Sequence, residues 1–452
     1  MFLAANNFKQ TETCGERSRT IGLIPEDWKV VRLGDIFHMQ QGKAMSPKSR
    51  LGISPRPFLR TVNVLWGRLN LTTLDYMDFT DEEITKLCLQ PGDLLVCEGG
   101  EVGRTAIWWG EIKVCGYQNH IHRLRKQRQD VWSEFYAYWM QAAFLIFDLY
   151  AGQEIKTTIP NLSGGRLKSF LVPLPPLPEQ RKIAKVLSTI QRAIEQQDKI
   201  IEATKKLKKS LMQKFFRFGI SDLGVADLKD TKIGLLPKNW EVARLEEMFD
   251  MQQGKAMSPK SRLGISPHPF LRTVNILWGN VDLSILDYMD FTDEEMTKLC
   301  LQPDDLLVFE GGEIGRTAMW RGEIEVCGYQ NHIHRLRKRR QDINPEFYMY
   351  WMQAAFLIFG LYAGEEIRTT IPNLSRGRLK SFLIPKPPFS EQQEIARILS
   401  TVDKKIATEE RREATLKELF KTMLHKLMSG EIRVKDVEFA DLGFANSREK
   451  HE

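Results

Sequence analysis

The sequence contains little cysteine and no long apolar run. Its six cysteines form no Cys-x-x-Cys pair, so neither a disulfide framework nor a cysteine-based zinc site is expected. Cys97 is replaced by Phe309 in the internal repeat described below, which indicates apolar packing. We therefore predict buried free thiols in a reduced, cytoplasmic protein. No apolar stretch approaches the roughly 18 to 20 residues that cross a bilayer, so no membrane partner is expected.

Residues 1–20 also lack the apolar core of a signal peptide, and we expect a disordered or loosely docked leader.

Sequence motifs for catalysis are missing as well. The run Gly99 to Thr105 resembles a phosphate-binding loop, but its spacing is too short and an arginine stands where the lysine belongs. A tight turn between strands is predicted instead. Pro387-Pro388-Phe389 lacks the asparagine that begins the Asn-Pro-Pro-aromatic motif of amino-methyltransferases. His120 and His122 would place two imidazoles on one strand face, yet no third ligand is evident. We expect no catalytic residue, no metal and no cofactor.

The composition is that of a globular protein with a mild excess of positive charge. Hydrophobic residues make up 42% and charged residues 27% of the chain, so a sizeable core can form. The formal net charge is +7, which is compatible with nucleic acid but does not identify it.

The most informative feature is an internal repeat. Residues 28 to about 190 are written again from Trp240, at an offset of 240 − 28 = 212 residues. Gln40 to Arg50 returns letter for letter as 252–262, and Tyr117 to Arg125 returns as 329–337. A duplicated unit predicts internal two-fold symmetry, which suits a partner with two equivalent sites such as duplex DNA.

Each repeat is predicted to be an α+β domain of about 150 residues. Strands are expected at Val30 to Leu33, Pro57 to Val64 and 93–96, and further strands at Ile112 to Val114 and His120 to Leu124. A buried helix is expected over Ser133 to Tyr150.

A long helix should follow each domain. Apolar residues recur every three or four positions, which is typical of a coiled-coil seam. We expect helices of about 55 Å, at 1.5 Å per residue. Ser390 with Gln393 forms a capping box and Gly430 is a stop signal. The alternative is a helix packed lengthwise on its own domain. The expected seam residues are Ile183, Leu187, Ile190, Ile194, Ile201, Leu207, Leu211 and Phe215 in the first helix, and Ile395, Leu399, Val402, Ile406, Leu416, Phe420, Met423 and Leu427 in the second.

The predicted architecture is thus two near-identical domains separated by two long antiparallel helices, with pseudo-two-fold symmetry. The boundaries are a leader at 1–20, a first domain at 21–178, a helix at 179–218, a linker at 219–232, a second domain at 233–389, a helix at 390–430 and a tail at 431–452.

Polar and basic loops are the candidate DNA-binding elements. Gln40 to Arg60 is a loop broken by Gly42 and Pro47, with lysine and arginine for phosphates and glutamine and serine for base edges. Tyr117 to Arg123 and Gln153 to Thr158 add two further polar groups. Simple solvated loops are the alternative, but the loops are among the segments that are identical between repeats. The candidate residues are Gln40, Gln41, Lys43, Ser46, Lys48, Arg50, Arg60, Asn119, His120, His122 and Lys156, with Gln252, Gln253, Lys255, Ser258, Lys260, Arg262, Arg272, Asn331, His332, His334 and Arg368 in the second repeat.

Several motifs now occur twice in the same order. They are Ile-Gly-x-(Ile/Leu)-Pro-x-x-Trp-x-Val-x-x-Leu, a Gln-Gly-Lys loop, Asp-Leu-Leu-Val followed by a Gly-Gly-Glu turn, and a Glu-Gln start to a long helix. Together they resemble the specificity subunit of type I restriction-modification enzymes.

The resemblance implies two target-recognition domains that each read half of a bipartite site in double-stranded DNA. It also implies a non-catalytic subunit that recruits two methyltransferase subunits, which methylate adenine, and motor-nuclease subunits that cleave. The helices, with exposed lysines at 205, 206, 208 and 209, would carry the methyltransferase docking surface. Recognition domains in one such subunit usually differ, whereas these are near twins, which suggests a palindromic target.

Two other readings remain open on the sequence alone. The first is a coiled-coil scaffold without DNA readout. The second is an enzyme with an unfamiliar site around His120 and His122. Salt-independent DNA binding would favour the scaffold, and methylation by the purified chain alone would favour the enzyme.

Overall fold

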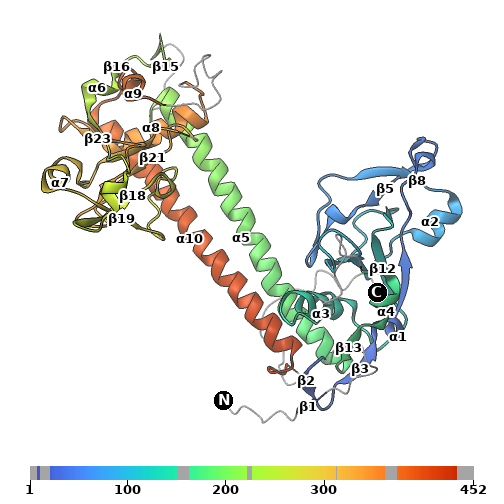
Figure 1. The fold of residues 1–452 in the computed structure, drawn as a ribbon. Coiled ribbons are helices and arrows are strands. Elements are labelled where there is room, and N and C mark those ends of the chain that lie inside the picture. The colour runs from blue at the N-terminus through green and yellow to red at the C-terminus, as the bar shows by residue number, and fades with distance from the viewer. Residues whose placement is uncertain are drawn as a thin grey trace. The chain divides into compact units, whose positions relative to one another are not determined.

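The computed structural model describes residues 8–10, 21–149, 162–220, 227–311, 313–361 and 374–434 (Figure 1). The chain divides into two compact units. Unit 1 comprises residues 1–196 and 413–452, and unit 2 comprises residues 197–412. The division cuts both long helices, α5 (Leu177–Phe218) and α10 (Phe389–Met428). Each unit therefore contains the first half of one long helix and the second half of the other.

Unit 1 contains two main sheets. The first is antiparallel, with strand order β10-β9-β12-β4, and the second has the order β11-β5-β8. Strands β3 and β13 pair near the two ends of the domain sequence. The strands are β1 (Phe8–Gln10), β2 (Leu23–Pro25), β3 (Lys29–Arg32), β4 (Phe37–Gln41), β5 (Pro55–Leu59), β6 (Val64–Leu65), β7 (Arg68–Leu69), β8 (Asp75–Asp78), β9 (Asp93–Cys97), β10 (Thr105–Trp108), β11 (Gly116–Tyr117), β12 (Ile121–Lys126) and β13 (Leu171–Leu174). The helices are α1 (Leu33–Ile36), α2 (Asp81–Leu87), α3 (Ser133–Leu145) and α4 (Gly164–Ser169), with 3-10 turns η1 (Pro47–Arg50) and η2 (Thr61–Asn63).

Unit 2 repeats this topology. Its sheets have the orders β17-β23-β20-β21 and β19-β18-β22, and β16 pairs with β24. The strands are β14 (Leu228–Thr231), β15 (Gly234–Pro237), β16 (Glu241–Arg244), β17 (Phe249–Gln253), β18 (Pro267–Leu271), β19 (Asp287–Asp290), β20 (Leu306–Phe309), β21 (Thr317–Met319), β22 (Gly328–Tyr329), β23 (Ile333–Lys338) and β24 (Leu383–Lys386). The helices are α6 (Leu245–Met248), α7 (Asp293–Leu299), α8 (Pro345–Leu357) and α9 (Arg376–Lys380), with 3-10 turns η4 (Pro259–Arg262) and η5 (Thr273–Asn275).

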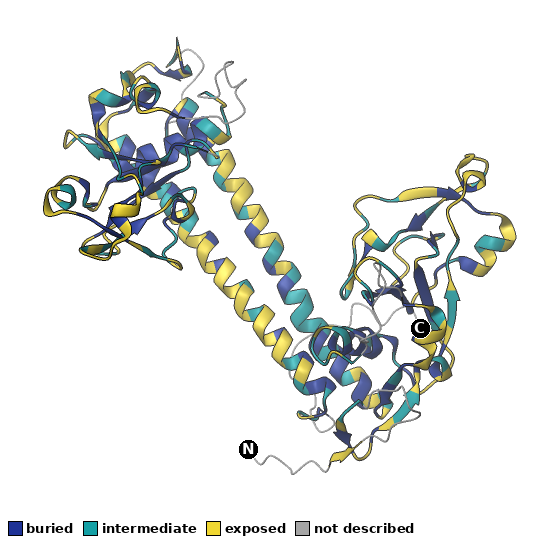
Figure 2. Ribbon diagram, viewed as in Figure 1, coloured by how far each residue is buried: buried dark blue, intermediate teal, exposed yellow. Residues whose placement is uncertain are grey.

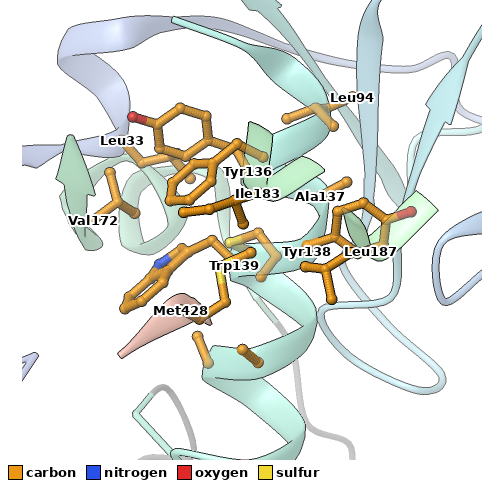
Figure 3. Packing of buried hydrophobic residues seen from close by; sticks show 14 of the residues in the cluster. Leu33, Leu94, Tyr136, Ala137, Tyr138, Trp139, Val172, Ile183, Leu187 and Met428 are labelled. Carbon is orange, nitrogen blue, oxygen red and sulfur yellow. The ribbon is translucent and has the colours of Figure 1, made fainter. Parts of the chain in front are cut away.

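The main core of unit 1 joins the four-stranded sheet to both long helices. Tyr136 and Trp139 of α3 pack beside Ile183 and Leu187 of α5, and Met428 of α10 lies against the same cluster (Figure 3). Burying one such side chain contributes about 1.5–3 kcal/mol. The equivalent core of unit 2 uses α8, the start of α10 and the end of α5. Among the helices that the structure describes, none is long and apolar enough to span a bilayer.

The structure combines the two arrangements expected for the long helices, a coiled-coil seam and packing on a domain. The end segments of α5 and α10 are buried in the domain cores, as in the alternative of packing on a domain. Between these end segments, Ile201 and Ile406 are also buried. The middle of each long helix is otherwise largely exposed or intermediate, with separate buried positions (Figure 2). Leu207 is 52% exposed, so its assignment to the seam is wrong, because its drift from the heptad turns it to solvent.

Polar contacts join the two helices within unit 2. Buried Gln197 donates to the carbonyl oxygen of Glu409 at 3.2 Å and to its carboxylate at 2.5 Å. Lys208 pairs with Asp403 at 2.7 Å and lies over the ring of Tyr350. Lys208 is therefore not the exposed lysine that we expected, whereas Lys205 is half-exposed in a pair with Glu410.

Six further expectations differ from the structure. Pro57 to Val64 is not one strand, because β5 ends at Leu59 and the 3-10 turn η2 separates it from β6. Ser390 does not cap the second long helix, because α10 already begins at Phe389. Residues 111–114 form bends and no strand, because the chain turns at Gly110, whose φ is +90°. The helix expected to reach Tyr150 ends at Leu145. Within the leader, Phe8–Gln10 is a strand paired with Leu23–Pro25. Within the expected linker, Leu228–Thr231 is a strand paired with Gly234–Pro237.

Candidate nucleic-acid interface

Two of the three polar segments meet in each unit. In unit 1 the Lys43 N–H donates to the carbonyl of Tyr117 at 3.0 Å, and the Asn119 N–H donates to the carbonyl of Lys43 at 2.9 Å. Gly42 is needed at this approach, because a Cβ there would lie 2.3 Å from the Tyr117 oxygen. The Tyr117 hydroxyl also donates to the carbonyl of Gln40. Residues 40–43 and 117–122 therefore lie together, and their exposed or half-buried members, which include Gln40, Asn119 and His120, form one shared surface.

Unit 2 builds the same surface from identical residues. The backbone N–H of Lys255 donates to the carbonyl of Tyr329 at 3.0 Å, and the backbone N–H of Asn331 donates to the carbonyl of Lys255 at 2.9 Å. A Cβ added to Gly254 would lie 2.3 Å from the carbonyl oxygen of Tyr329, as at Gly42 in unit 1. The identity between the repeats thus extends from sequence to local backbone geometry.

The loop from Ser46 to Ser54 is braced by side chains of the same domain. Ser46 and Ser49 cap η1 reciprocally. The Asp78 carboxylate accepts the Gly52 N–H at 2.8 Å and the Ser54 N–H at 2.7 Å. Burial raises the pKa of Asp78, but the backbone N–H donors outweigh it and leave the pKa below its ordinary value. Asp290 braces the second loop in the same way.

The exposed candidates on this loop are Lys48 and Arg50, with Lys260 and Arg262 in unit 2. Their side chains have no carboxylate partner in the described part of the chain. Ser46 and Ser258 are exposed, but their hydroxyls cap the 3-10 turns. Lysine and arginine on a fixed loop suit phosphate groups. Only the two side chains lose conformational freedom on binding, because the loop backbone is already held in place.

Two lysines that the sequence assigned to DNA have partners inside the protein. The Lys43 ammonium pairs with Glu83, donates to the carbonyl of Asp78 at 2.8 Å and lies over the Phe79 ring. Burial raises the pKa of Glu83, while hydrogen bonds from Lys43 and Thr80 bring it below its ordinary value. Lys255 makes the same contacts with Glu295 and Asp290. The structure thus gives Lys43 and Lys255 a bracing role.

The two histidines of each unit differ in burial. His120 is exposed in the turn before β12, whereas His122 is 3% exposed and its Nε2 lies 3.1 Å from the carbonyl oxygen of Leu162. The expectation that both imidazoles stand on one strand is wrong, because His120 precedes the regular strand. In unit 2, however, both histidines lie near the Glu310 carboxylate, His332 at 3.7 Å and His334 at 3.9 Å. Unit 2 has exposed His332 and buried His334. Burial lowers the pKa of His334 below its ordinary value.

A buried carboxylate lies beside each inner histidine and was missed by the sequence analysis. The Glu98 carboxylate accepts the Gln41 amide at 2.9 Å and lies 3.8 Å from His122. Glu310 is placed likewise against Gln253 and His334. Gln41 and Gln253 are therefore held in place by this carboxylate. The described residues contain no group of three or more His, Cys, Asp or Glu arranged for a metal ion.

The remaining candidates divide into three groups. Gln40 and Asn119, with Gln252 and Asn331, are half-buried at the shared surface. Arg60 pairs with Asp75 at 2.8 Å, and Arg272 pairs with Asp287 at 2.7 Å, so both are engaged on the surface. Lys156 and Arg368 lie outside the described residues.

A pocket of about 410 Å³ borders the braced loop in unit 2. Its lining includes buried Phe270 and Met289, exposed Tyr288, and Arg262 from the loop. An apolar and aromatic lining beside a cation suits a planar base with a nearby phosphate.

Comparison with known proteins identifies the family. The family model described as "Type I restriction modification DNA specificity domain" matches residues 25–206 and, separately, residues 237–418. The chain belongs to this family. The two matches cover both repeats, including residues 177–206 of the first long helix and residues 389–418 of the second.

Similar proteins extend the likeness over nearly the whole chain. The type I restriction enzyme MjaVIII specificity subunit of Methanocaldococcus jannaschii is 26% identical, over 92% of this chain and 95% of that protein. The EcoKI specificity subunit of Escherichia coli is 22% identical over 83% and 82%. The crystal structure of a type I system S subunit from M. genitalium matches with a TM-score of 0.54 at 16% identity, over 92% and 98% of the two chains. This structural likeness supports the fold expected from the repeated motifs.

Proposed function

We propose that this chain is the specificity subunit of a type I restriction-modification enzyme. Each domain binds one half of a bipartite site in double-stranded DNA, and the chain itself carries no catalytic step. Adenine methylation by two methyltransferase subunits and cleavage by motor-nuclease subunits are left to its partners. The family membership and the relatives named as specificity subunits support this role.

The observation that carries the proposal is a cationic loop built twice to the same plan. Lys48 and Arg50 are exposed on a loop that Asp78 and the two serines hold in place, and Lys260 and Arg262 repeat them. Gln40 and Asn119 lie at the neighbouring surface with amide groups of the kind that read adenine edges. The phosphate contacts are assigned to the loop and the base contacts to the amides.

Co-expression and methylome mapping test this function. The chain and the methyltransferase subunit of its own system should co-purify as a complex with two methyltransferase subunits per chain. Deleting the gene for this chain should remove a two-part adenine-methylation motif from the genome. A chain that stays alone at micromolar concentration, together with an unchanged methylome, would contradict the proposal.

A further inference from the structure

The braced loops end in apolar side chains that face solvent. In unit 1, Leu51 is 64% and Ile53 is 80% exposed, and in unit 2 Leu263 is 66% and Ile265 is 79% exposed. Single exposed apolar residues need no explanation. Here, however, two large aliphatic side chains stand two residues apart on one loop, and the second unit repeats both at nearly the same exposure.

The loop is held rigid at the position of these side chains. Gly52, between Leu51 and Ile53, has a φ of +75° and donates its N–H to Asp78. Ser54 donates to the other oxygen of the same carboxylate, and the Phe79 N–H donates to the Ser54 carbonyl. Gly264 repeats the φ of +75°. The two aliphatic side chains are therefore displayed by fixed backbone, so ordering them on binding costs little conformational entropy.

The charge around these side chains favours a polyanion. Residues 44–56 carry Lys48, Arg50 and Arg56 and no acidic residue, and residues 256–268 carry Lys260, Arg262 and His268. The nearest acids along the paired strand are already engaged: Asp78 holds the loop and Asp75 pairs with Arg60. The core of a protein–protein interface is depleted of lysine, so apolar residues surrounded by cations fit DNA better than a protein partner.

We propose that Leu51 with Ile53, and Leu263 with Ile265, form two apolar wedges that enter the duplex and unstack a base step. Proteins that bend DNA insert leucine or isoleucine in this way, and the unstacking energy is offset by the larger contact surface. Lys48 and Arg50 then hold the phosphates that flank the opened step. This inference rests on the proposed DNA recognition and adds local distortion of each half-site to it.

The test compares three full-length proteins in complex with their methyltransferase subunit. They are the wild type, a wedge variant with serine at all four positions (L51S, I53S, L263S and I265S), and a control with methionine at the same positions. The probe is a duplex carrying the mapped methylation motif, with 2-aminopurine in one half-site and fluorophores at both ends. Fluorescence of 2-aminopurine reports unstacking, and energy transfer between the ends reports bending.

The wild type and the methionine control should raise the 2-aminopurine signal and shorten the end-to-end distance. The serine variant should keep the wild-type unfolding midpoint, because the replaced side chains are exposed, and keep its salt dependence. It should lose both distortion signals and bind about tenfold more weakly. A mismatch at the opened step, which removes most of the unstacking cost, should bring its affinity close to that of the wild type.

Three results would overturn the inference. If the serine variant distorts the duplex as the wild type does, the wedge is absent while DNA recognition stands. If the variant binds and distorts DNA normally but releases the methyltransferase subunit, these side chains dock a protein. If the wild-type complex binds no duplex at all, the proposed function fails and the wedge with it.

Discussion

Lys43 and Lys48 are five residues apart in one polar loop, yet the structure gives them different roles. Sequence alone treats both as phosphate contacts, since both are lysines in an apolar-poor segment. Glu83, which binds Lys43, belongs to a helix 40 residues further along the chain. No local sequence pattern links Lys43 to Glu83, so the ion pair could not be predicted from the sequence. The two lysines therefore offer a matched pair for testing which cations meet DNA.

Replacing Lys48, Arg50, Lys260 and Arg262 with alanine should weaken DNA binding and flatten its salt dependence. Each lost phosphate contact should reduce the slope of log affinity against log salt by about 0.9. Binding is measured by fluorescence anisotropy at four or more salt concentrations. Exchanging Lys48 for arginine and Arg50 for lysine, with the same exchange in unit 2, keeps the charge and should keep the slope. An unchanged slope in the alanine variant would show that these loops face away from DNA.

His334 should make the stability of unit 2 depend on pH. Burial lowers the pKa of His334 from the ordinary value of 6.5. Between the lowered and the ordinary value, the folded state therefore binds fewer protons than the unfolded chain. The free energy of unfolding contributed by this group is present above pH 6.5 and is lost as pH falls through that window.

The variant His334→Gln retains an N–H that can reach Leu374 but does not titrate, so its unfolding midpoint should fall less between about pH 7.5 and pH 5.5. Thermal unfolding followed at several pH values measures the difference. Equal slopes for the wild type and the variant would show that another group sets the acid sensitivity of the unit. The cost of the substitution itself is read at the highest pH, where the histidine is neutral in both states.

At the scale of elements, the Glu-Gln start of each long helix ties the helix to its domain. The Gln180 amide accepts the Trp132 N–H at 2.9 Å and donates to the carbonyls of Asp130 and Pro175. Gln392 makes the equivalent three bonds in unit 2. The motif was recognisable in the sequence as the beginning of a helix. Its function as a clamp on the preceding loop depends on contacts 48 to 50 residues away.

The neighbouring glutamates are satisfied differently in the two units. Glu179 is 2% exposed and accepts the Trp28 indole N–H at 3.0 Å and two bonds from Arg433, which also holds Asp27. In unit 2, Glu391 accepts the Trp240 indole N–H and the backbone N–H of Ile220. The position of Asp27 is taken there by Asn239. In unit 2, therefore, the glutamate at the start of the long helix is satisfied without the additional carboxylate that Asp27 supplies in unit 1.

Replacing Arg433 with methionine should destabilise unit 1 by about 2–4 kcal/mol, because it leaves a buried carboxylate without its cation. These bonds also raise the pKa of Arg433 above its ordinary value, so the side chain is charged at every pH of interest. Calorimetry and hydrogen exchange of β3 and β13 measure the loss. Adding Asp27→Asn and Glu179→Gln to the methionine variant removes the unpaired charges and should recover part of the stability. A methionine variant as stable as the wild type would show that the network is neutral.

Element ends were the least predictable part of the fold. The helix Ser133–Leu145 was expected to continue to Tyr150, since aromatic and apolar residues run on without interruption. It ends because the chain reverses at Asp148, whose φ is +49°. The second unit has Gly360 at the matching position, with a φ of +61°. The sequence did contain a signal for this helix end, because the second repeat has a glycine where the first has Asp148. By contrast, Gly430 was read correctly, because its φ of +74° follows the last helical turn.

At the scale of the whole molecule, the repeat predicted two similar domains and two long helices, and the family match and the solved relative support this architecture. The candidate interface was predicted in part. The meeting of residues 40–43 with 117–122 follows from pairing of β4 with β12, which no local pattern reveals. The pairing of Lys43 with Glu83 and the burial of His122 could not be predicted, because both depend on residues that are distant in sequence.

The helix pair contains a contact that relates the repeats directly. Gln197 bonds to Glu409, and 409 − 197 = 212, which is the repeat offset. Equivalent positions of the two repeats therefore meet in the helix pair. Two copies of the same reader match a two-fold DNA sequence. Gln40 to Arg50 and Tyr117 to Arg125 are identical to their counterparts, so each domain should read the same bases.

The methylated target of the proposed complex should therefore be an inverted repeat, with half-site centres about one helical turn, or 10 base pairs, apart. Single-molecule sequencing of the source genome detects the methylated adenines and gives the motif. Exchanging Asn119 for serine in unit 1 alone should change the preference at one half-site and leave the other unaltered, since amides read adenine through paired hydrogen bonds. The same exchange at Asn331 should give the mirror-image result. Two unrelated half-sites in the wild-type motif would refute the symmetry, and a change at both half-sites from one substitution would show that the domains do not read independently.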